Sequence, residues 1–272
     1  DQGYIEMSLL NETDELVTFE DNNTRAFIKF NIYEGPRVRA ASVIIEGNTF
    51  TKDYVIYKEL EFNEGDYLSP KKLDESIARL QRTGFFSNVE VKTLEENSSV
   101  EDRTVLVKVS ERYPGVFTIG AGATNERIFT VRGYMSVSYR NLFGTGRGAS
   151  LRIDGNYNVA DIKYLESRIV FGWLEPYIFN TRIRGRINVM RSSRVTDFDL
   201  RQVSDVNSTT YSLEHDFTRN ILGIWDIWSL ATIRDFRLDD STPSVEQNIA
   251  WTGPTVDLDF RDNPFTPTRG TY

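Results

Sequence analysis

Few residues of this chain could do chemistry, and they are scattered along it. His215 is the only histidine of the 272 residues, and it lies between Glu214 and Asp216. A catalytic or metal role would need partners that converge in space on this one imidazole. The acid pairs Asp239–Asp240 and Asp257–Asp259 are the other candidates, for a calcium site or a glycosidase pair. We interpret all of them as strand-face or loop residues, and we predict a protein that is not an enzyme and holds no cofactor or metal.

The composition excludes several classes of protein. The chain contains no cysteine, so disulfides and thiolate metal sites are excluded. A net charge of −8 opposes general nucleic-acid binding, which needs a basic face. The mean hydropathy of −0.41 and the lack of a long apolar run exclude a membrane-spanning helix. A membrane barrel stays allowed, because its strands alternate apolar and polar residues.

The stretch YRNLFGTGRG at 139–148 is rich in glycine, which could indicate a phosphate-binding turn. Such a turn opens a helix, whereas the residues that follow this one alternate as a strand does. We therefore interpret Gly144, Gly146 and Gly148 as turn glycines between two long strands, where glycine allows positive φ. The stretch GAGATNE at 120–126 opens no helix either, so no nucleotide site is predicted.

Residues 36–113 carry a mixed pattern that predicts one domain. Its elements follow the order β-α-α-β-β, with strands at 38–48, 86–96 and 103–113 and helices starting near 51 and 69. Thr51 is the predicted N-cap of the first helix. The second helix has Ser69 as its N-cap, Pro70 at its first position and Gly84 as its stop. Residues 1–35 repeat the pattern of the final strand pair, which predicts the C-terminal part of a preceding repeat.

Residues 114–272 carry no helical pattern and alternate apolar and polar residues over long segments. Eight such segments are predicted, at 115–126, 129–143, 147–158, 161–175, 181–197, 203–220, 224–239 and 246–262. They exceed the roughly 5–6 residues of an ordinary strand, whereas about 9–11 residues cross a bilayer at a tilt.

The two faces of these segments differ in chemistry. One face carries Phe117, Ile119, Ala121, Ala123, Met135, Val137, Tyr139, Ile169, Phe171, Trp173, Ile183, Ile187 and Val189. The opposite face carries Arg140, Arg152, Glu166, Arg168, Arg182, Arg184 and Arg186. A soluble sandwich would bury the apolar face against a second sheet, and a membrane barrel would turn it to lipid around a wet lumen. Composition leaves both open. Segment length and aromatic residues near the strand ends, Phe179 and Trp228 among them, favour the barrel.

Several motifs occur together in one order along the chain. They are the Gly47–Thr49 turn, the Gly84–Phe86 helix exit, the glycine-rich hairpin and the segment that runs from Arg261 to Gly270. With the β-α-α-β-β module, these motifs resemble the BamA/TamA superfamily of outer-membrane barrels that follow POTRA domains. The resemblance covers essentially the whole chain. Its motif positions are Asn141, Leu142, Phe143, Gly144, Gly146, Arg261, Asp262, Asn263, Pro264 and Gly270.

The resemblance implies an α+β POTRA module at 36–113 in the periplasm. It implies that 1–35 ends a preceding POTRA-like repeat and that 114–272 is the N-terminal half of an antiparallel transmembrane β-barrel in the outer membrane. Barrels of this family are similar in having sixteen strands, so we expect the natural chain to continue past Tyr272. Closure as a small eight-stranded barrel and a composite wall of several chains are the alternatives. The family's Val-Arg-Gly signature is a late inward loop, so we assign no role to VRGY at 131–134.

The resemblance also implies an assembly factor for other outer-membrane proteins. Its partners would be unfolded outer-membrane protein clients, periplasmic or lipoprotein accessory subunits and outer-membrane lipid, with no nucleic acid. Clients would add a strand to the edge at Phe86–Leu94, or pair with the first barrel strand. The candidate residues are Phe86, Val89, Val91, Gly115, Gly120 and Gly122. A non-catalytic pore or structural barrel with a POTRA anchor is the rival, and a soluble two-domain adhesion module is a third possibility.

Overall fold

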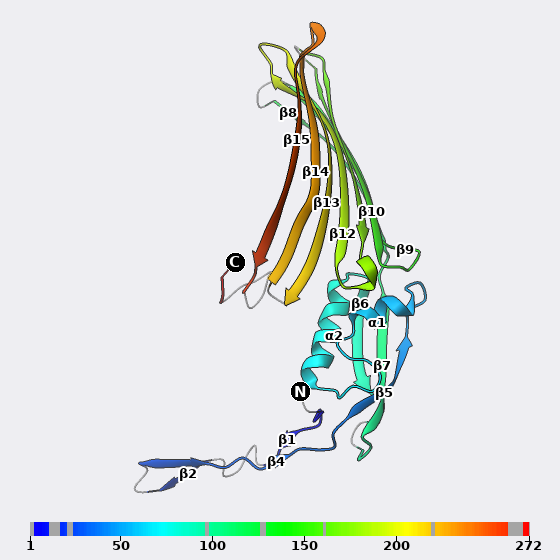
Figure 1. Cartoon of the computed structure of the whole chain (residues 1–272), viewed down its shortest axis with the longest axis vertical. Helices are drawn as coiled ribbons and strands as arrows, with labels where there is room; N and C mark the ends of the chain where they lie inside the picture. The colour runs from blue at the N-terminus through cyan, green and yellow to red at the C-terminus, as the bar shows by residue number, and fades with distance from the viewer. Residues whose placement is uncertain are drawn as a thin grey trace. The chain divides into compact units, whose positions relative to one another are not determined.

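The chain forms two compact units, Asp1–Arg112 and Tyr113–Tyr272, which are described separately (Figure 1). The computed structural model describes residues 3–10, 17–20, 24–95, 98–125, 129–159, 162–218, 221–260 and 269–271. None of the helices in this described part is long and apolar enough to cross a membrane.

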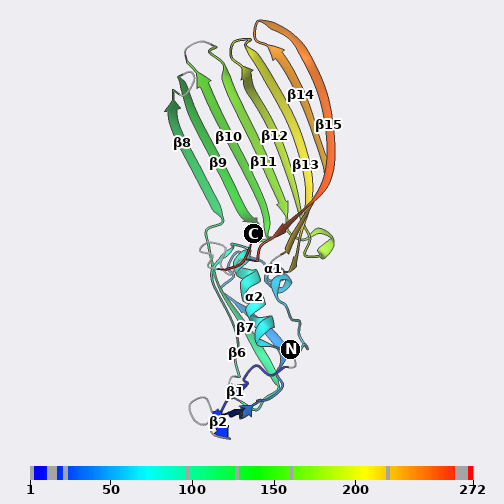
Figure 2. The same cartoon turned by 90° about the vertical axis from the view of Figure 1, so that its left-hand side faces the viewer.

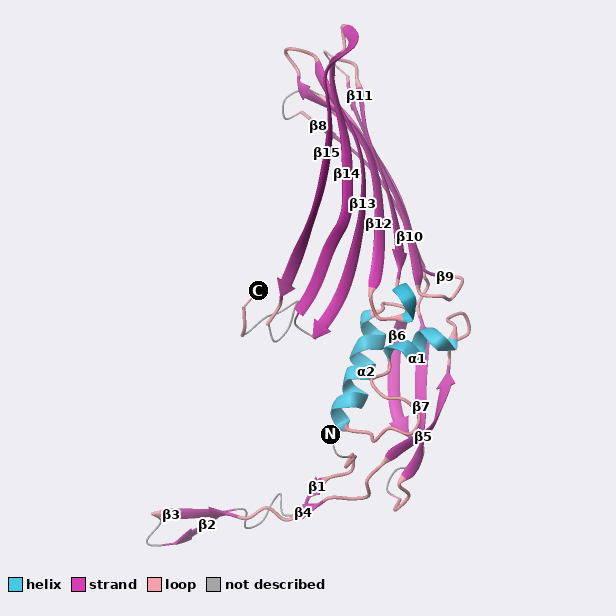
Figure 3. Ribbon diagram, in the orientation of Figure 1, coloured by secondary structure: helices cyan, strands magenta, loops and turns pink. Residues whose placement is uncertain are grey.

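The first unit contains the predicted β-α-α-β-β module (Figure 3). Its elements are β5 (Arg39–Glu46), α1 (Asp53–Glu59), α2 (Pro70–Arg82), β6 (Phe86–Thr93) and β7 (Asp102–Glu111). The strands form a sheet in the order β5-β7-β6, with β5 parallel and β6 antiparallel to β7. This arrangement confirms the predicted fold class of the module.

The helices cover one face of this sheet and enclose the hydrophobic core. Fully buried side chains come from every element, among them Ala40, Ile56, Leu80, Phe86 and Val107. Helix α2 packs against β6. Residues near both of its ends fix where it begins and stops. The Ser69 hydroxyl accepts a hydrogen bond from the Lys72 N–H, Pro70 starts the helix, and Gly84 follows its end with φ of 73°.

The first helix is capped differently from the prediction. Its N-cap is Lys52 rather than Thr51, and the Lys52 side chain makes no capping bond. The N–H of Thr51 instead donates to the Glu111 carboxylate at 2.6 Å. Glu111, at the end of β7, therefore holds the loop that leads into α1 and does not cap the helix itself.

The residues before β5 form two short antiparallel pairs. Strand β1 (Ser8–Leu9) pairs with β4 (Ile32–Tyr33), and β2 (Val17–Glu20) pairs with β3 (Arg25–Ile28). The segment is joined to the module by the Val38 N–H, which donates to the Gly3 carbonyl at 2.8 Å. The fully buried Arg103 also pairs with Glu6. That 1–35 ends a preceding repeat stays a prediction.

The second unit is one antiparallel sheet of eight strands within the described residues (Figure 2). Each strand pairs with its sequence neighbours, in the order β15-β14-β13-β12-β11-β10-β9-β8. The strands are β8 (Gly115–Thr124), β9 (Thr130–Leu142), β10 (Arg147–Asn158), β11 (Leu165–Glu175), β12 (Arg184–Asp197), β13 (Gln202–Thr218), β14 (Ile221–Arg237) and β15 (Asp240–Leu258). The eight segments predicted from alternation are therefore confirmed as strands, and the sheet is open between β8 and β15.

The register places the predicted apolar residues on one face of this sheet. Phe117, Val137, Leu151, Phe171 and Val189 lie side by side on five successive strands. Phe117 is 62% exposed, whereas a soluble sandwich would bury such a row against a second sheet. A face of this kind suits lipid, which supports the transmembrane reading over the sandwich.

Candidate functional site: open strand edges and a charged wall

Strand β6 lies at one edge of the POTRA-like sheet. One hydrogen bond shows which of its residues direct their backbone N–H and C=O groups toward β7 and which direct them outward. The Leu94 N–H donates to the Thr104 carbonyl at 3.0 Å, just beyond the strand end. Backbone groups alternate in direction along an antiparallel strand. Since Leu94 faces β7, Val89, Val91 and Thr93 direct their N–H and C=O groups away from the sheet. The described residues supply no partner for the outward groups of Val89 and Val91.

The opposite edge of the sheet, at β5, is capped. The Ala40 N–H donates to the Asp66 carbonyl at 2.9 Å, and the Ala40 carbonyl accepts from the Gly65 N–H at 2.7 Å. Further along, the Val43 N–H donates to the Glu64 carboxylate at 3.2 Å. The Val43 carbonyl accepts from the Tyr57 hydroxyl, also at 3.2 Å. The loop between α1 and α2, together with Tyr57 of α1, thus occupies the pairing groups of Ala40 and Val43 on β5.

The predicted binding residues of β6 are not surface side chains. Phe86, Val89 and Val91 are 2%, 7% and 9% exposed and belong to the core. Only their backbone groups reach the edge. The exposed side of β6 instead carries Glu90 and Lys92, whose side chains pair at 2.7 Å. A strand that binds here would therefore be held by main-chain hydrogen bonds, with charged side chains beside it.

Strand β8 is an edge strand of the second sheet within the described residues, and its three glycines are not equivalent. At Gly120, a Cβ atom would lie 2.3 Å from the Tyr134 ring on β9. At Gly122, a Cβ would meet nothing within 4 Å, and at Gly115 it would make ordinary contact with Tyr139. All three were predicted alike, as candidate residues for pairing with a client strand. Gly120 has another role, since it makes room for an aromatic ring across the strand pair.

The Tyr134 ring, which lies over Gly120, also contacts Arg152 on β10. The Arg152 guanidinium carbon lies 5.4 Å from the ring centroid, and Arg152 pairs with Asp154 at 2.7 Å. Strands β8, β9 and β10 are therefore linked on the polar face by more than their backbone ladder. Tyr134 lies in the VRGY stretch, to which the sequence analysis gave no role.

Gly120→Ala is expected to lower the free energy of unfolding in lipid by about 1–3 kcal/mol, because the methyl group must displace the Tyr134 ring. Gly122→Ala is the matched control and is expected to change little, since its site is open. Urea unfolding in lipid vesicles, followed by heat-modifiable gel mobility, measures both. Equal midpoints for the two variants would show that Gly120 is not a packing site.

The glycine-rich hairpin between β9 and β10 is a tight turn with several left-handed residues. Asn141, Phe143, Gly144 and Gly146 have φ of 66°, 56°, 72° and 79°. The buried Asn141 side chain accepts a hydrogen bond from the Gly146 N–H at 2.7 Å. Asparagine tolerates this conformation better than most residues, which explains its place here.

The remaining motif positions are less uniform. Leu142 is the last residue of β9. Gly148 is not a turn glycine, since it lies inside β10 at a register shift and has no positive φ. Gly270 has φ of 101°. Arg261, Asp262, Asn263 and Pro264 lie outside the described residues.

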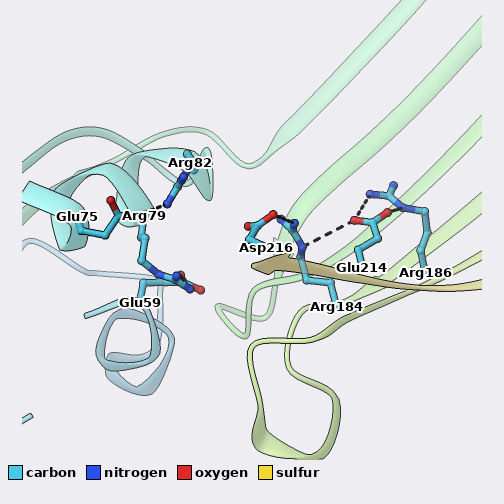
Figure 4. Close-up of polar contacts among 8 residues, drawn as sticks. All are labelled: Glu59, Glu75, Arg79, Arg82, Arg184, Arg186, Glu214 and Asp216. Carbon is cyan, nitrogen blue, oxygen red and sulfur yellow. Dashed lines mark hydrogen bonds and ion pairs between the residues drawn. The ribbon is translucent and has the colours of Figure 1, made fainter. Parts of the chain in front are cut away.

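The polar face of the second sheet carries a cluster of ion pairs, drawn in Figure 4. The Glu214 carboxylate, on β13, lies 2.8 Å from Arg186 Nε and 3.7 Å from Arg184 Nε, both on β12. Arg184 also reaches Asp216 at 3.0 Å. The two acids beside His215 are thus used in structural ion pairs. In the described residues, no group of three or more metal-ligating side chains comes together.

The same figure shows two ion pairs of helix α2 in the first unit. Arg79 lies 3.2 Å from Glu59 of α1, and Arg82 lies 2.8 Å from Glu75. The first pair ties the two helices to each other, while the second is a half-exposed pair within α2 and contributes little.

Comparison with known proteins matches both units. A POTRA family model, described as surface antigen variable number repeat, matches residues 38–112. The chain is 27% identical over 262 residues to the outer membrane protein assembly factor BamA of Neorickettsia risticii, covering 92% of this chain. It is 34% identical over 125 residues to BamA of Nitratidesulfovibrio vulgaris, covering 46% of this chain. The chain spans 33% and 15% of the length of these two relatives.

Solved structures share the fold. BamA from Haemophilus ducreyi lacking POTRA domains 1–3 matches with a TM-score of 0.61 at 18% identity, covering 99% of this chain and 52% of that one. CdiB from Acinetobacter baumannii matches with a TM-score of 0.55 at 11% identity, covering 95% of this chain and 52% of that one. Together with the POTRA module and the open eight-stranded sheet, these matches show that the chain is similar to the BamA/TamA superfamily of outer-membrane β-barrel proteins with periplasmic POTRA domains.

Proposed function

We propose that this protein is an assembly factor for outer-membrane proteins and that its POTRA module receives clients at the free edge of β6. The observation that carries the proposal is the difference between the two edges of the POTRA sheet. At β5 the pairing groups of Ala40 and Val43 are already bonded, whereas those of Val89 and Val91 at β6 point outward. An extended client chain would therefore meet open pairing groups at β6, whereas at β5 the groups of Ala40 and Val43 are already bonded.

Binding of this kind depends on the client's backbone more than on its side chains. Main-chain hydrogen bonds supply the affinity, and they are available to almost any extended segment except at proline. On the exposed side, Glu90 and Lys92 carry opposite charges, so neither acidic nor basic client segments are repelled by a net charge there. This tolerance suits a factor that serves many different barrels.

Strand β8 is the proposed second contact with the client. It is the first strand of the barrel sheet, and its free edge can pair with an incoming strand. A client strand that pairs there inside the membrane satisfies backbone groups that lipid cannot. Accessory periplasmic or lipoprotein subunits and outer-membrane lipid complete the proposed set of partners.

A photo-crosslinking side chain tests the choice of edge in the full-length protein in cells. Introduced at Lys92, on the exposed face of β6, it is expected to crosslink several different unfolded outer-membrane proteins. The matched control is Ile44, which is 43% exposed on the capped strand β5 and is expected to capture few or none. Equal capture at both positions, or capture at Ile44 alone, would contradict the proposed edge.

Depletion of the protein separates the assembly role from the rival pore role. If the protein assembles barrels, the folded amounts of unrelated outer-membrane proteins fall when it is removed, while their messenger RNAs persist. If it is a non-catalytic pore or structural barrel with a POTRA anchor, those amounts do not change, and the assembly proposal fails.

A further inference from the structure

The turn between β11 and β12 folds back onto the apolar face of the second sheet. The turn contains the short helix η1 (Ile178–Asn180). It is closed by the Ile178 N–H, which donates to the Ile183 carbonyl at 2.9 Å. The Ile178 side chain covers Gly185, where a Cβ atom would lie only 2.3 Å from Ile178 Cδ1. The same Cβ would lie 3.2 Å from the Tyr211 hydroxyl. Glycine at 185 thus allows the turn to pack against the strand.

The register shows which face the turn covers. Gly185 is paired with Leu213 and stands two residues before Ile187 on β12. Ile187 is itself paired with Trp173 on one side and Tyr211 on the other. All of these residues belong to the apolar, lipid-facing side, because residues two apart on a strand share a face. The turn is therefore an extension of the lipid-facing surface.

Phe179 at the tip of this turn is in an unusual conformation. Its φ and ψ are 50° and 33°, and Asn180 follows with φ of 63°. An aromatic residue seldom adopts the left-handed region, which favours glycine and asparagine. The Phe179 side chain is 94% exposed, so no packing within the chain compensates for the conformation. Such unfavourable backbone conformations cluster at functional sites, ligand-contacting residues among them.

The position of the tip identifies the surface it meets. Antiparallel order puts the end of β11 at the same end of the sheet as Gly115, where the chain enters from the POTRA unit. That end faces the periplasm. Trp173 and Tyr211 lie on the apolar face near it, and such aromatic residues are typical of the boundary between hydrocarbon and water. Phe179 lies just beyond them along the strand direction.

We infer that the β11–β12 turn is a membrane-interface anchor, in which Phe179 inserts at the boundary between headgroups and acyl chains of the periplasm-facing phospholipid leaflet. Ile178 holds the turn against the barrel wall, and the left-handed conformation of Phe179 leaves its ring free for lipid. The anchor would set the height of strands β11 and β12 in the bilayer. The inference depends on the barrel lying in a membrane and is independent of which clients it assembles.

A single thiol probe tests this contact, because the 272 residues contain no cysteine. Phe179→Cys is made in the full-length natural chain, with any cysteine elsewhere replaced by serine, and labelled with the fluorophore NBD. The protein is reconstituted in phosphatidylcholine vesicles, with and without lipids that carry a nitroxide near the headgroup. We expect blue-shifted emission, strong quenching by the nitroxide lipids, and iodide quenching several-fold weaker than for a probe in water.

Leu200→Cys is the matched control, since Leu200 is 55% exposed at the tip of the β12–β13 turn, at the opposite end of the sheet. Its probe is expected to be open to iodide and little affected by nitroxide lipids. Equal iodide access at both positions would overturn the inference. So would a probe at 179 that is shielded from iodide yet not quenched by nitroxide lipids, because a protein partner would then cover the turn.

Discussion

Leu151→Arg is expected to reduce the free energy of folding into a bilayer by about 2–4 kcal/mol, the cost of arginine on the lipid face near the midplane. Leu151 lies near the middle of β10 and is paired with Val137 and Phe171 on the apolar face. An arginine there has neither water nor a carboxylate within the apolar row. Urea titration of folding in lipid vesicles, read by heat-modifiable mobility, measures the difference from the natural sequence.

The adjacent position supplies the control for this prediction. Ser150 faces the opposite, polar side and is paired with the small residues Ser138 and Gly172. Ser150→Arg is expected to fold almost as well as the natural sequence, because its guanidinium can reach the wet lumen. If both variants lost the same free energy, the assignment of the two faces would be wrong.

Arginine at Ile187 is expected to cost less than arginine at Leu151. Ile187 is the fourth residue of β12, which begins at Arg184, so it lies near the periplasmic end of the strand. The cost of a charge on the lipid face falls to roughly 0–1 kcal/mol near the interfaces. Arg184→Gln on the polar face is expected to be mild, since Glu214 keeps Arg186 at 2.8 Å. A penalty at 187 as large as at 151 would contradict the depths assigned here.

Glu111→Ala is expected to destabilise the POTRA module by about 2–4 kcal/mol, given that hydrogen bonds to a charged group contribute roughly 1.5–3 kcal/mol each and water replaces part of the loss. The Glu111 carboxylate accepts four hydrogen bonds from the loop before α1. They come from the N–H groups of Thr49, Phe50 and Thr51 and from the Thr49 hydroxyl. Hydrogen exchange of α1 and β5 in the full-length protein reports the loss.

Two variants show whether the carboxylate itself is responsible. Glu111→Gln keeps one acceptor oxygen for Thr49 and Phe50 but turns an N–H₂ group toward the Thr51 N–H, so an intermediate loss is expected. Glu90→Gln removes a half-exposed carboxylate that pairs with the half-exposed Lys92 and is expected to leave exchange unchanged. An unchanged Glu111→Ala variant would mean that the loop folds without its cap.

The same carboxylate makes the module sensitive to acid. Burial by itself would raise the pKa of Glu111, but the hydrogen bonds from Thr51, Thr49 and Phe50 outweigh it and hold the pKa below its ordinary value. A carboxyl whose pKa is lower in the folded chain stabilises the fold fully above its unfolded pKa. That contribution is lost as the pH falls through the folded pKa. Glu111→Gln is therefore expected to remove part of the acid destabilisation.

The sequence by itself determined the features that depend on near neighbours along the chain. Ser69, Pro70 and Gly84 define helix α2 because capping involves residues within one helical turn. The eight barrel strands and their apolar face follow from the two-residue alternation, since successive side chains of a strand point to opposite faces. The order of the motifs indicated the resemblance to the superfamily, which the comparisons support.

Only the tertiary structure decided the features that join distant residues. It showed that β5 is capped by the loop carrying Glu64 and Asp66, which leaves β6 as the open edge. It also showed that Glu111 holds the loop before α1 through Thr51, sixty residues away in the sequence. The fit of Tyr134 over Gly120 likewise depends on the register between two strands. Local patterns specify which way a side chain or a helix end is directed, but a free edge, a remote hydrogen-bond acceptor and a close contact exist only once the chain has brought distant segments together.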